Sequence, residues 1–69
     1  MGTNLRPIIE RMIEHFGTQE ALAEAADVSQ SAVSQWLREE TKPGIRSLNR
    51  IQSATNGKFK VRKIRPELF

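Results

Sequence analysis

Two short helical segments follow one another with almost no chain between them, and this spacing restricts the possible fold more than any other feature. The first spans residues 19–26 and follows Thr18, a favourable helix N-cap, and the second begins after another N-cap, Ser29. Only residues 27–29 separate them. Short helices joined by such a turn are typical of a helix-turn-helix, which we predict at about residues 18–37.

Further helices are predicted on both sides of this motif. Apolar residues recur at helical spacing over residues 5–16, where Thr3 or Asn4 can cap the start and a glycine ends the segment. The same periodicity over residues 45–55 predicts a fourth helix, which stops at the Asn-Gly pair 56–57. The predicted fold is therefore all-α, a compact domain of four to five helices.

The segment after the Asn-Gly pair allows two interpretations. Phe59 and Val61 alternate as in a short strand, whereas Val61, Ile64 and Leu68 fit a helical turn. We favour the helix, with a short strand pair over residues 58–69 as the alternative. We expect exposed apolar residues of this segment to form the dimer interface, namely Phe59, Val61, Leu68 and Phe69.

The 69 residues contain no cysteine, so a single domain over residues 1–69 must depend on packing rather than on disulfides or thiolate metal sites. No apolar run has the length of a transmembrane helix, and a cytoplasmic protein is expected. His15 is the only histidine, and no nucleophile–base pair or glycine-rich phosphate loop is present. We expect no catalysis, cofactor, metal or small-molecule ligand.

Charge is distributed unevenly along the chain. Up to Glu40 three basic residues stand against seven acidic ones, whereas eight basic residues and no acidic residue lie between Lys42 and Arg65. The basic part, which includes a C-terminal segment at about residues 57–69, predicts an anionic partner. The alternative is an ordinary solvated basic surface.

One face of the third predicted helix carries only uncharged hydrogen-bonding side chains, those of Gln30, Ser31, Ser34 and Gln35. Glutamine can form two hydrogen bonds with adenine, and serine can donate to or accept from base edges. An ordinary solvated helix face would usually carry lysine and glutamate. We therefore predict that these four residues read DNA bases, while Val33 and Trp36 on the other side enter the core.

The run from His-Phe-Gly-Thr-Gln at residues 15–19 to Ala-Val-Ser-Gln-Trp at residues 32–36 resembles the Cro repressors of lambdoid phages and the related YdaS-like prophage regulators. The ending, residues 63–69, is also similar to that of the YdaS-like proteins. The resemblance implies a homodimer that represses transcription from double-stranded operator DNA in a prophage. One departure is Asp27, where the family usually has glycine in a left-handed turn.

The resemblance also implies which side chains meet DNA. Gln19 would touch the phosphate backbone, and Ser29 would join the base-reading residues on the DNA-facing side. The cations at and after the end of the third helix are further candidates for phosphate contact because of their position and charge. Arg50 is a weaker candidate than the others. Arg38 could instead stabilise the C-terminal end of that helix. The predicted phosphate contacts are Thr18, Gln19, Ser29, Arg38, Lys42 and Arg46.

Two other functions remain open at the level of sequence. A DNA-binding partner of a toxin pair would share the fold and differ in operon context. A helical protein-interaction module would present Val33 and Trp36 to a partner, and its basic tail would bind an acidic protein. This alternative predicts an exposed Trp36 and no sequence-specific DNA binding. An enzyme is disfavoured because a catalytic constellation is missing.

Overall fold

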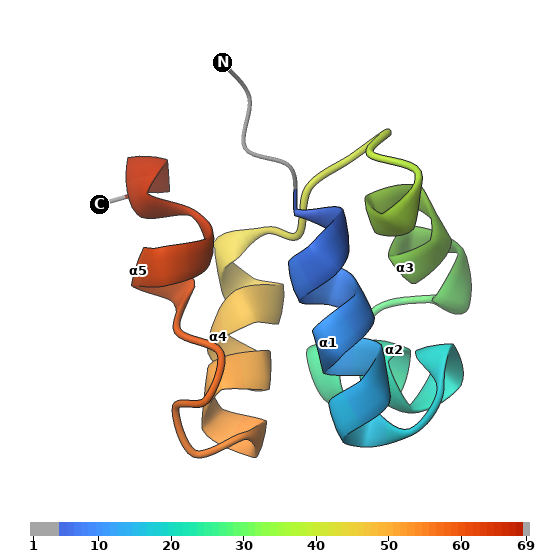
Figure 1. Ribbon diagram of the computed structural model, residues 1–69, viewed down its shortest axis with the longest axis horizontal. Helices are drawn as coiled ribbons and strands as arrows, with labels where there is room; N and C mark the ends of the chain where they lie inside the picture. The colour runs from blue at the N-terminus through green and yellow to red at the C-terminus, as the bar shows by residue number, and fades with distance from the viewer. Residues whose placement is uncertain (1–4, 69) are drawn as a thin grey trace.

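The computed structural model describes residues 5–68, and all regular secondary structure within that range is helical (Figure 1). Four main helices surround one core, and a short C-terminal segment packs against the last of them. The elements in order are α1 (Arg6–Phe16), α2 (Gln19–Ala26), α3 (Gln30–Leu37), α4 (Ile45–Ala54), α5 (Val61–Ile64) and a 3₁₀ turn (Pro66–Leu68). The predicted all-α fold is confirmed, and no strand occurs among residues 5–68.

The helix-turn-helix is formed by α2 and α3, and both predicted N-caps are in place. The Thr18 hydroxyl accepts a hydrogen bond from the Ala21 amide at 3.0 Å, and the Ser29 hydroxyl accepts one from Ala32 at 3.2 Å. Asp27 adopts the left-handed conformation at φ 59° and ψ 47°. These local hydrogen bonds fix the start of each helix and therefore the direction in which each side chain of α3 points.

The start of α1 differs from the prediction. Leu5 occupies the N-cap position without a side-chain cap, Pro7 lies in the first turn, and Gly17 ends the helix at φ 103°. Thr3 and Asn4, the predicted caps, lie outside the described residues. Proline is tolerated at this end because its missing N–H would have had no partner within the helix.

Residues from both ends of the described chain form the core. Ile9 and Met12 of α1 are fully buried, as are Leu22 and Val33 of the helix-turn-helix, and Trp36 is only 4% exposed. The same apolar cluster continues into the C-terminal segment, through Phe59, Val61 and Ile64.

This burial corrects one expectation. Phe59 is 7% exposed and Val61 is 1% exposed, so both belong to the core rather than to the exposed apolar surface expected for a dimer interface. The side chains of Leu68 and Phe69, the other two candidates, lie outside the described part. By contrast Ile45, the first apolar position of the predicted fourth helix, is 42% exposed.

Polar side chains of α4 attach the C-terminal segment. The Gln52 side-chain oxygen accepts a hydrogen bond from the Val61 amide at 2.9 Å, which caps the start of α5. The buried Thr55 hydroxyl donates to the Ile51 carbonyl at 2.8 Å and accepts from the Phe59 amide at 3.4 Å. The Phe59 and Val61 amides therefore have acceptors on α4 and need no partner on a neighbouring strand. The segment forms α5 and the 3₁₀ turn instead.

Candidate DNA-binding surface

The predicted reading face of α3 is accessible. Gln30 and Ser31 are exposed in the first turn of α3, and Ser34 and Gln35, one turn later, are partly buried. The opposite side of the helix enters the core through Val33 and Trp36. The third helix therefore has one packed side and one accessible side of uncharged hydrogen-bonding groups, as the sequence predicts.

A direct contact joins this face to the start of α2. The Ser34 hydroxyl donates to the side-chain oxygen of Gln19 at 3.5 Å, across the junction of the two helices. The contact fixes Gln19 beside the α3 residues and leaves its amide NH₂ group as a donor. A predicted phosphate contact and a predicted base-reading residue thus lie side by side.

The two N-cap residues are exposed, but their hydroxyl groups already accept hydrogen bonds from their own helices. A hydroxyl can still donate its proton, so Thr18 and Ser29 each retain one donor for an anion. Both sit at helix N-termini, where the helix dipole favours negative charge.

Three cations of the predicted phosphate set differ in their surroundings. Arg38 forms an ion pair with Glu40, with 3.3 Å between Nε and Oε2, so a phosphate would have to displace that carboxylate. Lys42, in the loop before α4, and Arg46, in its first turn, are exposed and form no ion pair within residues 5–68. Within the described part of the chain, neither of these two has an ion pair to exchange before it meets an anion, although the Glu67 carboxylate attracts Lys42 at longer range.

Arg50 has a partner that the sequence did not indicate. Its Nη2 atom lies 3.6 Å from Oδ2 of Asp27, in the turn between α2 and α3. Arg46, Ser47 and Arg50 line a small hollow with this turn. The contact depends on how α4 crosses the helix-turn-helix, which residue spacing within α4 cannot reveal.

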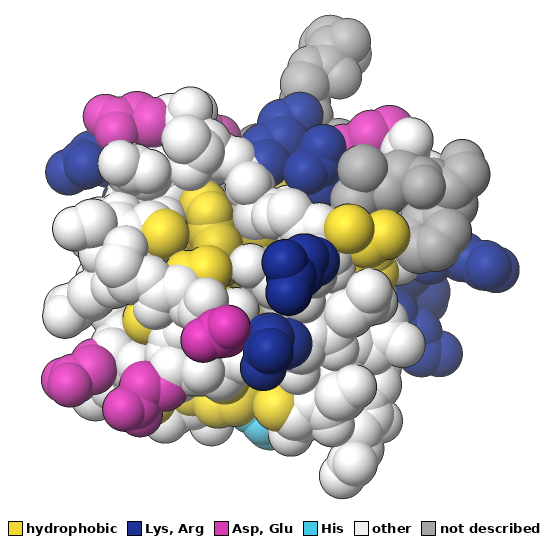
Figure 2. Space-filling view, turned by 180° about the vertical axis from the view of Figure 1, so that it is seen from behind, with side chains coloured by type: hydrophobic (Ala, Val, Ile, Leu, Met, Phe, Trp, Pro, Cys, Tyr) yellow, Lys and Arg dark blue, Asp and Glu magenta, His cyan; other side chains and the backbone are white. Residues whose placement is uncertain are grey.

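The charged side chains are unevenly distributed on the surface. On the face shown in Figure 2, basic side chains lie at the centre and toward the right edge and acidic ones gather at the lower left, while both kinds occur along the upper edge. Near the C-terminus, a hydrogen bond from Arg65 lowers the pKa of the Glu67 carboxyl below its ordinary value of 4.5. The same Arg65 donates to the Pro43 carbonyl at 3.0 Å and thereby holds the loop that carries Lys42.

With this geometry established, comparison with known proteins identifies the family. A family model for the DNA-binding transcriptional regulator Cro matches residues 9–67, nearly all of the described part. The chain belongs to the Cro family of DNA-binding transcriptional regulators. The regulatory protein Cro of Pseudomonas phage D3 is 37% identical over 59 residues, which cover 86% of this chain and 81% of that protein. No solved structure matches the chain at a comparable level of significance.

Membership of the Cro family confirms the resemblance predicted from sequence and makes this chain a bacteriophage-type DNA-binding regulator. The family is one of transcriptional regulators rather than of enzymes. In the part of the chain that the structure describes, no helix is long and apolar enough to cross a membrane.

Proposed function

We propose that this Cro-family regulator represses transcription by reading an operator in the major groove of double-stranded DNA with α3. The observation that carries the proposal is the accessible face of α3, where Gln30, Ser31, Ser34 and Gln35 offer hydrogen-bonding groups without a competing charge. An α-helix fits the major groove, where each base pair presents a distinct pattern of donors and acceptors. Residues 1–69 would act as one DNA-binding domain.

In this proposal the phosphate backbone is held on both sides of α3. Gln19 would donate its amide to a phosphate while Ser34 fixes its oxygen, and Thr18 and Ser29 would add hydroxyl donors. Lys42 and Arg46 would neutralise phosphates beside the groove, and Arg38 would join them by exchanging Glu40 for phosphate. These contacts would supply affinity and salt dependence, and the base edges would supply sequence preference.

We further propose that two copies bind one operator. Helix-turn-helix dimers place their reading helices about one turn of DNA apart, and the operator mirrors the two-fold symmetry of the protein. Because Phe59 and Val61 are largely buried in the core, a dimer contact would rest mainly on other residues.

The experiment is a binding selection from a randomised duplex pool at two salt concentrations, followed by sequencing of the retained DNA. An enriched two-fold symmetric site would support the operator-reading dimer, and an enriched site without symmetry would support reading by a monomer. Retention without enrichment would contradict base reading and leave a nonspecific DNA binder. No retention would contradict the whole proposal.

The competing protein-interaction module required an exposed Trp36. That side chain is 4% exposed and belongs to the core, so the apolar side of α3 is not free for a partner. Regulation of a toxin pair would use the same DNA surface, and the neighbouring genes rather than the fold would separate it from lysis–lysogeny control.

A further inference from the structure

A groove lies between α1 and the C-terminal segment, on a part of the surface that the DNA-binding proposal does not use. Its volume is about 500 Å³, within the range of ligand-binding clefts. Its apolar floor is formed by Ile8 of α1, which is partly buried, and by the small exposed parts of the core residues Phe59 and Ile64. None of the residues proposed to contact DNA lines it.

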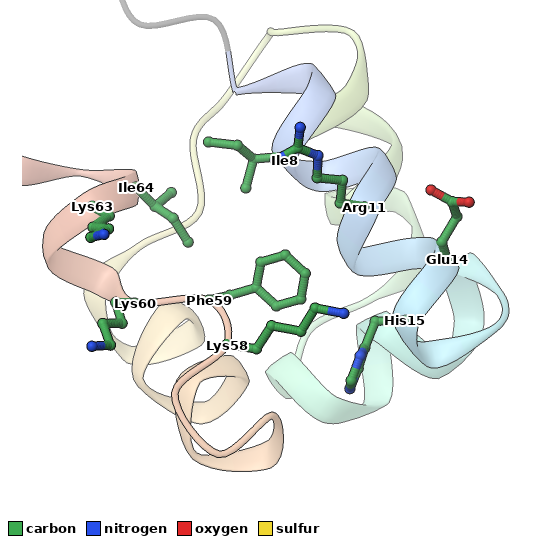
Figure 3. A pocket seen from close by; sticks show the side chains of 9 residues that line it. All are labelled: Ile8, Arg11, Glu14, His15, Lys58, Phe59, Lys60, Lys63 and Ile64. Carbon is green, nitrogen blue, oxygen red and sulfur yellow. The ribbon is translucent and has the colours of Figure 1, made fainter.

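The rim of the groove is strongly basic. Arg11, Lys58, Lys60 and Lys63 line it, together with His15 and a single carboxylate, that of Glu14. Figure 3 shows the Phe59 ring in the middle of the groove, with the Arg11 and Lys58 side chains on opposite sides of it and Glu14 pointing away. The Lys58 ammonium lies 5.7 Å from the centre of the Phe59 ring.

These four cations differ from several other cations of the chain in forming no ion pair within residues 5–68. Arg38, Arg50 and Arg65 each form an ion pair with a carboxylate. Within residues 5–68, no ion pair involves any of the four cations at the rim. Unpaired positive charge therefore surrounds an apolar floor, which is the arrangement of a protein interface with an apolar centre and a charged rim.

We propose that this groove docks an acidic segment of another protein, which inserts one apolar side chain between α1 and Phe59 and pairs its carboxylates with Arg11 and Lys58. Duplex DNA matches the charge, but its regular sugar-phosphate backbone has no projecting apolar side chain that could enter the groove. The inference goes beyond the proposed operator binding and does not depend on it, because the groove and the α3 face share no residue.

The test uses the full chain and a fluorescein-labelled synthetic peptide with glutamates on both sides of one phenylalanine. Saturable binding by fluorescence anisotropy is expected, with NMR shifts at the His15 and Phe59 rings. Alanine in place of the phenylalanine, or lysines in place of the glutamates, should abolish it. No saturation, or equal binding of the alanine peptide, would overturn the proposal.

A matched pair of double variants distinguishes this site from general charge attraction. Arg11→Gln with Lys58→Gln should raise the Kd of the peptide about tenfold, since two ion pairs are lost. Lys42→Gln with Arg46→Gln removes the same charge elsewhere and should leave the Kd within about twofold, because screening in salt limits its long-range effect. Equal weakening by both double variants would overturn the proposal. Circular dichroism checks that both remain folded.

The same variants, titrated with duplex DNA, keep the two proposals separate. The Lys42 and Arg46 variant should lose most DNA affinity, while the groove variant retains it within a fewfold. DNA affinity lost mainly in the groove variant, with duplex displacing the peptide, would assign the groove to DNA and overturn the docking of a protein. If the Lys42 and Arg46 variant binds DNA as tightly as the wild type, the proposed phosphate contacts are wrong and the docking proposal is unaffected.

Discussion

Arg50 of α4 reaches the carboxylate of Asp27, with 3.6 Å between Nη2 and Oδ2, and so joins the turn of the helix-turn-helix to the helix that carries Arg46. Asp27 has the left-handed conformation, which costs a residue with a Cβ atom about 1 kcal/mol relative to glycine. Both side chains are more than half exposed, at 54% for Arg50 and 72% for Asp27, so the ion pair contributes at most about 1 kcal/mol to the free energy of unfolding.

Replacement of Asp27 by glycine tests this balance. Asp27→Gly should raise the free energy of unfolding by up to about 1 kcal/mol, because relief of the left-handed conformation outweighs an exposed ion pair. Thermal unfolding would show this as a midpoint several degrees higher. Asp27→Asn is the matched control, since it removes the charge but tolerates the conformation, and its stability should change by less than about 0.5 kcal/mol. A glycine variant less stable than the wild type, together with a similar loss in the asparagine variant, would mean that the ion pair dominates.

Base reading by α3 predicts a difference between two kinds of DNA. Gln30→Ala should weaken binding to the selected operator by about 1–3 kcal/mol and leave binding to random duplex nearly unchanged, because only a base contact is lost. Electrophoretic mobility shifts with both duplexes measure this difference. The same loss on both duplexes would contradict base reading by Gln30.

Phosphate contact by Lys42 predicts the opposite pattern. Lys42→Ala should weaken binding to operator and random duplex alike, and it should reduce the slope of log K against log salt by about one, because one fewer counterion is released. Titrations at several salt concentrations give that slope. An unchanged slope would remove Lys42 from the phosphate-contacting set.

The buried hydroxyl of Thr55 predicts a stability effect near the C-terminal segment. Thr55→Val keeps the shape of the side chain but leaves the Phe59 amide without its acceptor, at a cost of about 1–3 kcal/mol. Chemical denaturation measures the loss, and hydrogen exchange at the Phe59 amide should become faster. Thr55→Ser, which retains the hydroxyl, should keep that amide protected. Equal exchange in both variants would show that the hydroxyl does not hold the segment.

The lowered pKa of Glu67 predicts that the stability of the fold depends on pH. Its pKa is lower in the folded chain than its ordinary value of 4.5, so its pairing with Arg65 stabilises the fold above that pH. This contribution is lost as the pH falls through the lowered pKa and the carboxylate takes up a proton. Glu67→Gln should therefore lower the unfolding midpoint slightly near neutral pH, and the difference from the wild type should vanish at low pH. A difference that persists or grows in acid would contradict the pairing.

The helix-turn-helix could be predicted almost to the residue because its determinants are local. Thr18 and Ser29 cap helices that start immediately after them, and Asp27 takes the left-handed turn expected there. The periodicity of residues 45–55 likewise matches α4, although Ile45 is exposed because it stands in the first turn, before the helix reaches the core.

The C-terminal segment could not be predicted in the same way. Its apolar spacing fits a strand and a helix equally well, and the deciding contacts come from Gln52 and Thr55 on another helix. The predicted exposure of Phe59 and Val61 was wrong for the same reason: spacing within a short segment does not reveal what packs on it. The groove beside Arg11 was also missed, since its two walls are far apart in the sequence.

The hydrogen bond from Arg65 to the Pro43 carbonyl spans 22 residues, and the core that supports α3 includes Phe59, Val61 and Ile64. During synthesis, the helix-turn-helix leaves the ribosome before these supporting residues do. We therefore expect a chain that ends before Arg65 to lack the core that supports α3 and to bind DNA poorly, so that interrupted translation yields no competing half-active regulator.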